Sequence, residues 1–318
     1  MDVGILGTGS YLPEKILTNN DLEKMVDTSD EWIFTRTGIK ERRVATEEQS
    51  SSDLAYEAAI EALENANLKA DVLDLIIVAT VTPDHSMPST ASIIQDRIGA
   101  KNASAFDLSA ACTGFIYGIT TATQFVKAGL YKHVLVIGVD CLSKIIDWTD
   151  RNICVLFGDG AGAAIIGPVK KGYGFLSFDL GSDGSGGDLL IQHPGSFLQM
   201  NGKEVYKFAV KIMEQSTNRV IEKANLLKED INFLIPHQAN IRIIDYAKDR
   251  LKLNDDKVIV NLDYYGNTSS ASIPIALDEA NRSNKLHDGD NILLVSFGGG
   301  LTWGSAIIKW SKQQVKKG

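Results

Sequence analysis

The sequence has few of the features that define several large protein classes. Its three cysteines are too few, and odd in number, for a disulfide framework. The scarcity of cysteine is typical of a protein of the reduced cytoplasm. The longest strongly apolar runs, Leu75–Val81 and Val134–Val139, are far too short to cross a bilayer. A net charge of −8 disfavours nucleic acid as the main partner, and the first residues lack a signal peptide's basic region and cleavage site. We therefore expect neither a membrane protein nor a secreted disulfide-rich protein nor a nucleic-acid-binding arm.

The composition is that of a globular chain, with 44% hydrophobic and 23% charged residues among 318. This length suits two domains of roughly 150 residues each. Short β-branched runs alternate with helical stretches, which predicts α/β layers with largely parallel sheets. No linker is evident, so the division is placed at the Gly167–Gly172 break, giving halves 1–170 and 171–318. The expected strands include Leu75–Thr80, Val134–Val139 and Ile292–Val295, and the expected helices include Ser52–Ala66, Thr113–Ala128 and Glu204–Ala224.

An internal repeat relates the two halves. Between the matched segments of each half lies a strand that runs through a turn of small residues into a helix. The turn of the first half carries Cys112, and the turn of the second half carries Asn267. Two similar halves, each with a special side chain at its turn, predict a site at their junction. The matched segments are Asp71–Val78 with Glu229–Pro236, and Phe157–Ile166 with Phe297–Ile308.

Cys112 is the cysteine with the best functional context. It follows an expected strand, Ser104–Leu108, and precedes a helical pattern that ends near Gly129, a residue suited to a helix C-terminus. A thiol at a helix N-terminus is favoured as thiolate by the helix dipole. A cysteine taken alone is more often a small buried apolar residue, and that interpretation holds for Cys141 and Cys154.

His237 and Asn267 complete a thiol–imidazole–amide set with Cys112. Each of the three lies where a strand gives way to a helix, which is where functional side chains gather in α/β proteins. A papain-like cysteine hydrolase uses such a set with a similar Cys–His separation, although the sequence around its cysteine is absent here. Acyl transfer to a carbon nucleophile also uses such a set. Both chemistries stay open on these residues alone.

The glycine-rich segments do not form nucleotide-binding loops. The dinucleotide fingerprint fails at Leu12, and Gly158–Gly162 leads into a strand-like run, not a helix. The turn Gly298–Gly300 differs, because an unhindered backbone N–H there could reach a reacting oxygen. Trp32 and Arg36, four residues apart, could pair a flat stacking surface with a cation that suits a nucleotide.

With these motifs in place, the sequence resembles the beta-ketoacyl-acyl carrier protein synthase III family, the initiating condensing enzymes of bacterial type II fatty-acid synthesis. The resemblance covers nearly the whole chain. It implies a thiolase-like fold of two duplicated α/β halves in a five-layered α-β-α-β-α arrangement, and a homodimer. The segments that carry it are Thr28–Trp32, Arg36–Ile39, Ala110–Cys112, Leu156–Gly162, Pro236–Asn240, Tyr265–Ser269 and Phe297–Gly304.

The resemblance also implies roles for individual residues. Cys112 would accept the acyl group, His237 and Asn267 would handle malonyl decarboxylation, and the backbone N–H groups of Cys112 and Gly299 would form the oxyanion hole. Met87 stands where the family commonly has a phenylalanine that caps the partner subunit's acyl pocket. The positions matching coenzyme A contacts are Thr28, Trp32, Arg36, Arg151 and Asn240, and those matching carrier-protein contacts are Lys207, Lys211, Arg242 and Gln238.

The implied reaction joins an acyl-CoA primer, acetyl or short and branched, to malonyl-acyl carrier protein with loss of CO₂. Coenzyme A enters as a thioester substrate, and neither a metal nor a resident cofactor is expected. An asparagine at position 267, where elongating synthases have a second histidine, favours the initiating type. A related enzyme that primes a specialised polyketide is the alternative.

Overall fold

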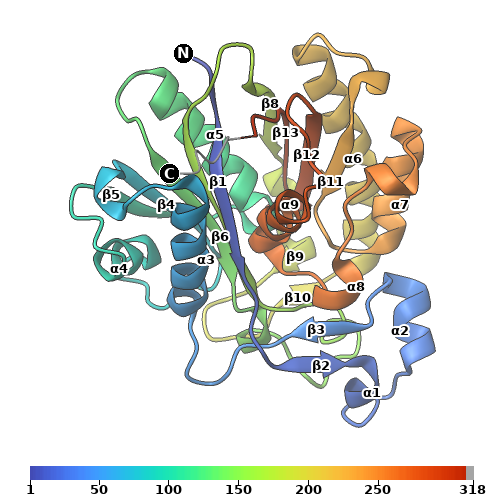
Figure 1. The fold of residues 1–318 in the computed structure, drawn as a ribbon. Helices are drawn as coiled ribbons and strands as arrows, with labels where there is room; N and C mark the ends of the chain where they lie inside the picture. Colours follow the sequence, from blue (N-terminus) through green and yellow to red (C-terminus); the bar gives the residue numbers. More distant parts are fainter. Residues whose placement is uncertain (313–318) are drawn as a thin grey trace.

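Two mixed β-sheets form the framework of the computed structural model, which describes residues 1–312 (Figure 1). The strand order is β1-β7-β6-β4-β5 in one sheet and β11-β12-β13-β8 in the other. The first sheet comprises β1 (Val3–Tyr11), β4 (Leu75–Ala79), β5 (Ser104–Leu108), β6 (Val134–Asp140) and β7 (Gly160–Pro168). The second comprises β8 (Gly174–Ser182), β11 (Phe233–Pro236), β12 (Asn291–Gly298) and β13 (Thr302–Lys309).

The expectation of largely parallel sheets is wrong. Strand β4 runs parallel to β5 and β6, and β11 runs parallel to β12, but the pairings β1–β7, β6–β7, β12–β13 and β8–β13 are antiparallel. The continuous apolar runs reflect burial of a strand on both faces, and such burial does not depend on strand direction. Hydrophobicity therefore located the strands without giving their direction.

The duplication expected from the sequence is confirmed by the two strand orders. β1, β7, β6 and β4 of the first sheet correspond in order and direction to β8, β13, β12 and β11 of the second. Within the described residues, no strand of the second sheet corresponds to β5. A single parallel bridge between Leu234 and Val258 takes its place. The division at residues 170 and 171 falls between β7 and β8.

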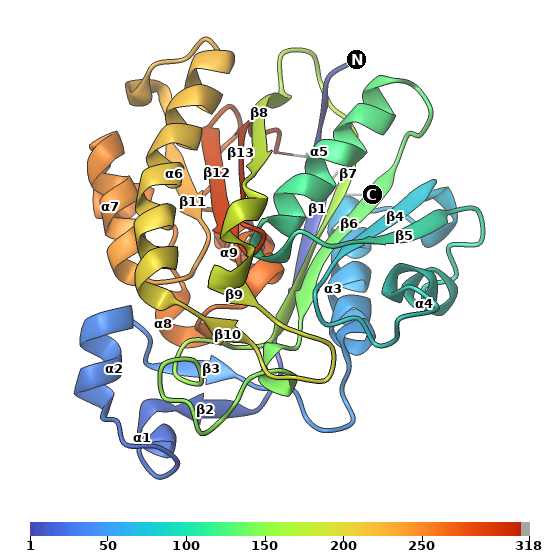
Figure 2. The same ribbon diagram turned by 180° about the vertical axis from the view of Figure 1, so that it is seen from behind.

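Helices on both sides of each sheet complete five layers (Figures 1 and 2). α5 and α9 lie between the sheets and contact strands of both, whereas α3 and α4 cover the outer face of the first sheet and α6 and α7 that of the second. The largest buried cluster joins α5 and α9 to both sheets, so the core is continuous across the halves. The bounds are α3 (Ser51–Ala66), α4 (Thr90–Arg97), α5 (Gly114–Lys127), α6 (Gly202–Lys223), α7 (Ile241–Leu251) and α9 (Ser272–Arg282).

A smaller group of elements, much of it blue at the bottom of Figure 1, lies beside the second sheet. The fully buried Arg42 guanidinium joins its parts by donating to the Leu17 carbonyl (3.0 Å), Asn19 Oδ1 (2.9 Å) and the Val155 carbonyl (2.9 Å). Within residues 1–312, no helix has the length and apolar character needed to span a bilayer. The elements are β2 (Ile16–Thr18), α1 (Asn19–Leu22), α2 (Asp30–Thr37), β3 (Glu41–Arg43), β9 (Leu190–Ile191), β10 (Gln199–Met200) and α8 (Leu262–Tyr265).

Candidate active site

Two cavities meet at Cys112. The larger, about 1060 Å³, is lined by all three members of the predicted set, Cys112, His237 and Asn267. The second, about 810 Å³, is lined by Cys112 together with apolar side chains such as Leu142 and Leu198. The predicted set is therefore brought together, and its thiol is shared between a channel and a pocket.

Cys112 lies in a 3₁₀ turn, Ala111–Thr113, that leads directly into α5. Its backbone carbonyl accepts a hydrogen bond from Ser296 Oγ on β12 (2.8 Å). A side chain at Gly298 would place its Cβ only 2.8 Å from the Cys112 nitrogen, so this approach requires glycine. The glycine turn after β12 thus lies directly against the nucleophile turn, as an oxyanion hole made of their N–H groups needs.

The expected stabilisation of the Cys112 thiolate is not what the structure gives. Burial raises the pKa of the thiol to about 12, a hydrogen bond from Ser269 lowers it, and the nearby Asp140 carboxylate raises it further. This desolvation opposes the helix dipole at the start of α5, which favours the thiolate. Cys112 is therefore held as a thiol at neutral pH.

His237 follows β11 directly and is 1% exposed. Its Nδ1 lies 2.7 Å from Ser272 Oγ, and its ring meets the ring of Phe297 edge-on, with 5.5 Å between centroids. Burial lowers the pKa of the imidazole to about 3. The ring is therefore neutral near pH 7 and can offer one N–H and one lone pair.

Asn267 is fixed by its backbone and by one end of its amide. Its N–H donates to the Leu156 carbonyl (2.8 Å), and its carbonyl accepts from the Gly158 N–H (3.0 Å). Its side-chain Oδ1 accepts from the Ser269 N–H (2.8 Å). Because Oδ1 is used in this way, the amide presents its Nδ2 hydrogens as the end free to act in the cavity.

The residues matching coenzyme A contacts gather around α2. The Arg36 guanidinium lies 4.4 Å from the centre of the Trp32 ring, and that of Arg151 lies 5.4 Å from it. The predicted pairing of Trp32 with Arg36 is therefore confirmed. Asn240 donates through Nδ2 to the Arg36 carbonyl (3.0 Å), and the Thr28 hydroxyl is buried without a hydrogen-bond partner within the described part of the chain.

The residues matching carrier-protein contacts separate into two groups. Lys207 and Lys211 lie on the exposed face of α6, and Arg242 is exposed at the mouth of the larger cavity, where it donates to the Thr35 carbonyl (3.0 Å). Gln238 is wrongly placed in this group, because it is 1% exposed. Its amide is used internally, with Nε2 on the Pro236 and Ile259 carbonyls and Oε1 on the Asn261 N–H.

Met87 is 86% exposed and does not line the pocket of its own chain, although His85, Ser86 and Ser89 do. The side chain thus projects away from the molecule beside the pocket. This placement suits a residue that acts on another subunit.

The serines around Asn267 were not among the predicted site residues. Ser269 contacts both Asn267 and Cys112, and Ser272 contacts His237. Their signal in the sequence is the concentration of hydroxyl residues at Thr268, Ser269, Ser270 and Ser272, interrupted only by Ala271.

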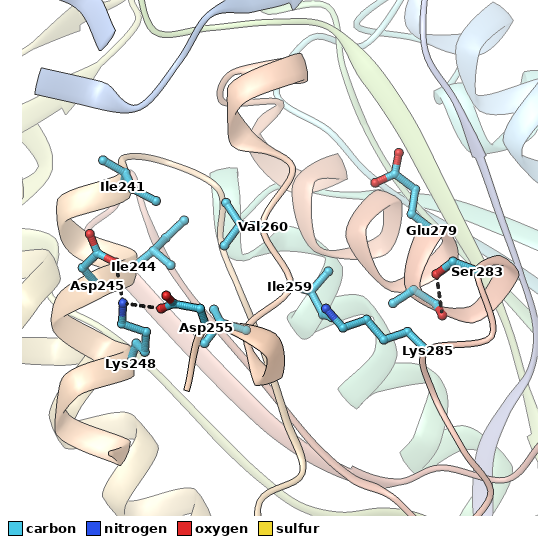
Figure 3. Close-up of a pocket in the computed structure, with 12 residues that line it drawn as sticks. Ile241, Ile244, Asp245, Lys248, Asp255, Ile259, Val260, Glu279, Ser283 and Lys285 are labelled. Atoms are coloured by element: carbon cyan, nitrogen blue, oxygen red, sulfur yellow. Dashed lines mark hydrogen bonds and ion pairs between the residues drawn. The ribbon is translucent and has the colours of Figure 1, made fainter. Parts of the chain in front are cut away.

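A separate cavity of about 560 Å³ lies between α7 and α9 (Figure 3). Its apolar floor includes Ile244 and Ile259, and Lys248 at its rim is paired with Asp245 (3.1 Å) and Asp255 (2.8 Å). None of the catalytic set lines it.

The five layers and the thiol–imidazole–amide set define a condensing enzyme of the thiolase-like class. Two models of 3-oxoacyl-[acyl-carrier-protein] synthase III match residues 106–184 and, for the C-terminal part, 221–310. A beta-ketoacyl-[acyl-carrier-protein] synthase III of Caldanaerobacter subterraneus is 61% identical, over 97% of this chain and 98% of that protein. The chain belongs to the beta-ketoacyl-[acyl-carrier-protein] synthase III family.

Solved structures agree with this assignment. The 3-oxoacyl-[acyl-carrier-protein] synthase III of Aquifex aeolicus superposes with a TM-score of 0.95 at 50% identity, covering 97% of this chain and all of that one. A priming beta-ketosynthase from the R1128 polyketide pathway superposes with a TM-score of 0.93 but is 35% identical, covering 98% and 97%. This chain is therefore more similar in sequence to the Aquifex aeolicus synthase III than to this polyketide enzyme, and a cysteine hydrolase is disfavoured.

Proposed function

We propose that the protein catalyses the decarboxylating condensation of an acyl-CoA primer with malonyl-acyl carrier protein, giving 3-oxoacyl-acyl carrier protein, coenzyme A and CO₂. This is the step that initiates type II fatty-acid synthesis. The observation that carries the proposal is the meeting of Cys112, His237 and Asn267 in one cavity, with an adjoining apolar pocket behind the thiol.

In the first half-reaction, Cys112 takes the acyl group. The thiol loses its proton, Sγ bonds to the thioester carbonyl carbon, and the bond to the coenzyme A sulfur breaks, so that coenzyme A leaves as a thiol. The N–H groups of Cys112 and Gly299 stabilise the tetrahedral oxygen, and one such donor is worth about 3–4 kcal/mol. The close approach of Gly298 to the Cys112 nitrogen supports this arrangement.

In the second half-reaction, malonyl-carrier protein loses CO₂ and forms an enolate. The N–H of His237 and the Nδ2 hydrogens of Asn267 donate to the enolate oxygen. The carbanion then bonds to the acyl carbonyl carbon, and the bond to Cys112 Sγ breaks, so that the thiolate takes up a proton. These donors meet the enolate charge, so we propose that no metal or resident cofactor takes part.

The adenine nucleotide of coenzyme A would lie at Trp32, flanked by Arg36 and Arg151. A flat ring beside two guanidinium groups suits an aromatic base that carries phosphates. The pantetheine arm would pass Asn240, which lines the larger cavity, and Thr28, whose buried hydroxyl has no hydrogen-bond partner within residues 1–312.

The acidic carrier protein would approach α6 and the N-terminus of α7. Lys207, Lys211 and Arg242 give this face exposed positive charge on a chain of net charge −8. Opposite charges steer association more than they raise final affinity. Gln238 is buried and does not belong to this surface.

A homodimer would form along β5. This strand ends the first sheet and carries a partly exposed Phe106, so its free edge can pair with a second copy. Met87 would then reach the partner subunit's acyl pocket. The three free cysteines support a reduced, cytoplasmic location.

The test is reconstitution with purified enzyme, malonyl-acyl carrier protein and a series of acyl-CoAs. We expect 3-oxoacyl-carrier protein and one CO₂ per turnover with acetyl-CoA or with short, branched acyl-CoAs. Activity confined to an unusual primer would favour the alternative, a specialised polyketide pathway. Hydrolysis of acyl-CoA without condensation would contradict the proposal.

A further inference from the structure

We propose that Ser272 is a positioning residue that holds His237 in the Nε2–H tautomer. The inference rests on the proposed role of His237 as a donor to the enolate oxygen. It adds the group that determines which end of the imidazole is a donor.

The hydrogen bonds of the Ser272 hydroxyl determine the tautomer. Among residues 1–312, Ser272 Oγ has two hydrogen-bond neighbours, His237 Nδ1 at 2.7 Å and the Gln238 N–H at 3.4 Å. The Gln238 N–H can only donate, so it uses a lone pair of Oγ. The hydroxyl hydrogen then has His237 Nδ1 as its acceptor. If His237 Nδ1 carried the hydrogen, the buried hydroxyl would have nothing to donate to, which is unfavourable.

The surroundings hold the Ser272 hydroxyl and the His237 ring in fixed relative positions. Ser272 is the first residue of α9 and is buried, and His237 is confined by Phe297 on one side. α9 is itself anchored, because its buried Asp278 accepts from Thr8 Oγ1 and Ser10 Oγ of β1, both at 2.7 Å. The bond to His237 therefore comes from a rigid element, and a site built on such elements is held more precisely than one built on loops.

The consequence concerns the charge that develops in the reaction. With hydrogen on Nε2, His237 and the Asn267 amide both offer N–H donors to one oxygen. With hydrogen on Nδ1, a lone pair on Nε2 would face the enolate oxygen and repel it. Because the ring is buried and neutral, the tautomer alone distinguishes these two outcomes.

The test compares Ser272→Ala with Ser270→Ala in protein labelled with ¹⁵N-histidine. Ser270 belongs to the preceding turn, and its hydroxyl donates to the Ala79 carbonyl (2.9 Å) and to Asp140 (2.8 Å) without contacting His237. The spectrum of His237→Ala identifies the His237 signals. We expect wild-type signals of a protonated Nε2 and a bare Nδ1 between pH 5 and 8, and the same His237 signals in Ser270→Ala.

In Ser272→Ala, we expect the two ¹⁵N signals to move toward each other as the tautomers mix. CO₂ release from malonyl-carrier protein should fall about tenfold, while acylation of Cys112 stays within about twofold, because loss of one hydrogen bond corresponds to such a factor. Ser272→Thr, which keeps the hydroxyl, should restore both readouts.

A protonated Nδ1 in the wild type would overturn the inference, as would unchanged signals and unchanged CO₂ release in Ser272→Ala. Failure of the proposed function is separate. In that case His237→Ala would release CO₂ at the normal rate, whatever tautomer the wild type shows.

Discussion

The two turns at the centre of the molecule share a backbone form and differ in chemistry. Ala111 and Ser269 both adopt positive φ angles, 46° and 53°, and each begins a 3₁₀ turn that leads directly into a central helix. In this register Cys112 corresponds to Ser270, whose hydroxyl is buried, whereas Asn267 precedes its turn. Duplication thus supplied one scaffold twice, and only the first copy places a nucleophile at the cavity.

Each turn also packs against the sheet of the other half. The Cys112 carbonyl is bound by Ser296 of the second sheet, and the Ser270 carbonyl lies against Gly138 of the first sheet. The site therefore depends on both halves and on their junction, and each half-reaction can be disturbed from the opposite sheet.

The largest effect is expected from a methyl group added at Gly298 or at Gly138, the glycines against which the two turns pack. In Gly298→Ala the new Cβ would lie 2.8 Å from the Cys112 nitrogen, and in Gly138→Ala it would clash with the Ser270 carbonyl oxygen. We expect Gly298→Ala to slow Cys112 acylation more than about 100-fold, the cost of losing an oxyanion donor. Gly138→Ala should lower the stability by about 1–3 kcal/mol, as overpacking does.

The measurements are labelled acyl-CoA trapping and thermal unfolding. Gly184→Ala is the matched control, since no atom lies within 4 Å of the position that its Cβ would take and its φ is ordinary. Wild-type acylation in Gly298→Ala would show that the glycine turn does not shape the site of the nucleophile.

The two halves also differ in their response to pH. The pKa of His237 is lowered to about 3, so the unfolded chain binds a proton below about pH 6.5 that the native state refuses. This contribution to stability is complete above pH 6.5 and is lost as the pH falls toward 3. We expect the unfolding free energy, measured with urea, to change less steeply with pH in His237→Ala than in the wild type. An equal dependence on pH would mean that the native ring is protonated.

The reactivity of the Cys112 thiol is expected to respond to pH in the alkaline range. Since burial raises the pKa of Cys112 to about 12, its alkylation by iodoacetamide should still be accelerating at pH 10. A plateau near pH 8 would show that the helix dipole prevails after all.

A moderate effect is expected from charge reversal at Arg242. Arg242→Glu should raise the KM for malonyl-carrier protein about tenfold at low salt and less at high salt, because salt screens long-range attraction. The acyl-CoA half-reaction should change little. Lys171→Glu, on the exposed β7–β8 loop, carries the same charge change and should leave the KM unaltered. Equal damage to both half-reactions would place Arg242 in coenzyme A binding or folding.

The smallest effect is expected at Met87. A flexible methionine can move aside where a phenyl ring forms a wall, so the natural enzyme should accept butyryl- and isobutyryl-CoA beside acetyl-CoA. Met87→Phe should shift the kcat/KM ratios toward acetyl-CoA by roughly 10-fold or more, since a methylene in an apolar pocket is worth about 1–3 kcal/mol. Unchanged ratios would make Met87 a packing residue.

Local patterns in the sequence sufficed for much of the fold. The strand Ser104–Leu108 was predicted with its observed bounds, and Gly129 has positive φ just after α5, because periodicity and helix-end preferences are local properties. Strand direction was not predictable from the apolar runs, since a strand buried on both faces reads the same in either direction.

The candidate site was predictable as a set of residues but not as a network. Cys112, His237 and Asn267 all stand in family motifs, and Cys112 and His237 follow strands β5 and β11 as expected. The strand expected before Asn267 is wrong, because this residue follows the helix α8. The bond from Ser272 to His237 joins residues 35 positions apart, and the Gln238 amide is held by Ile259 and Asn261, which are distant in sequence, so neither is visible in local sequence. The repeat located both turns, but it paired Cys112 with Asn267, whereas the backbone pairs Cys112 with Ser270, three residues further along the chain.

The most direct test of the account separates the two half-reactions by residue. Cys112→Ala and His237→Ala are compared by trapping labelled acyl-enzyme and by measuring CO₂ release from malonyl-carrier protein. We predict that Cys112→Ala forms no acyl-enzyme but still releases CO₂, and that His237→Ala is acylated but releases CO₂ at least about 100-fold more slowly. Normal CO₂ release from His237→Ala would contradict the account.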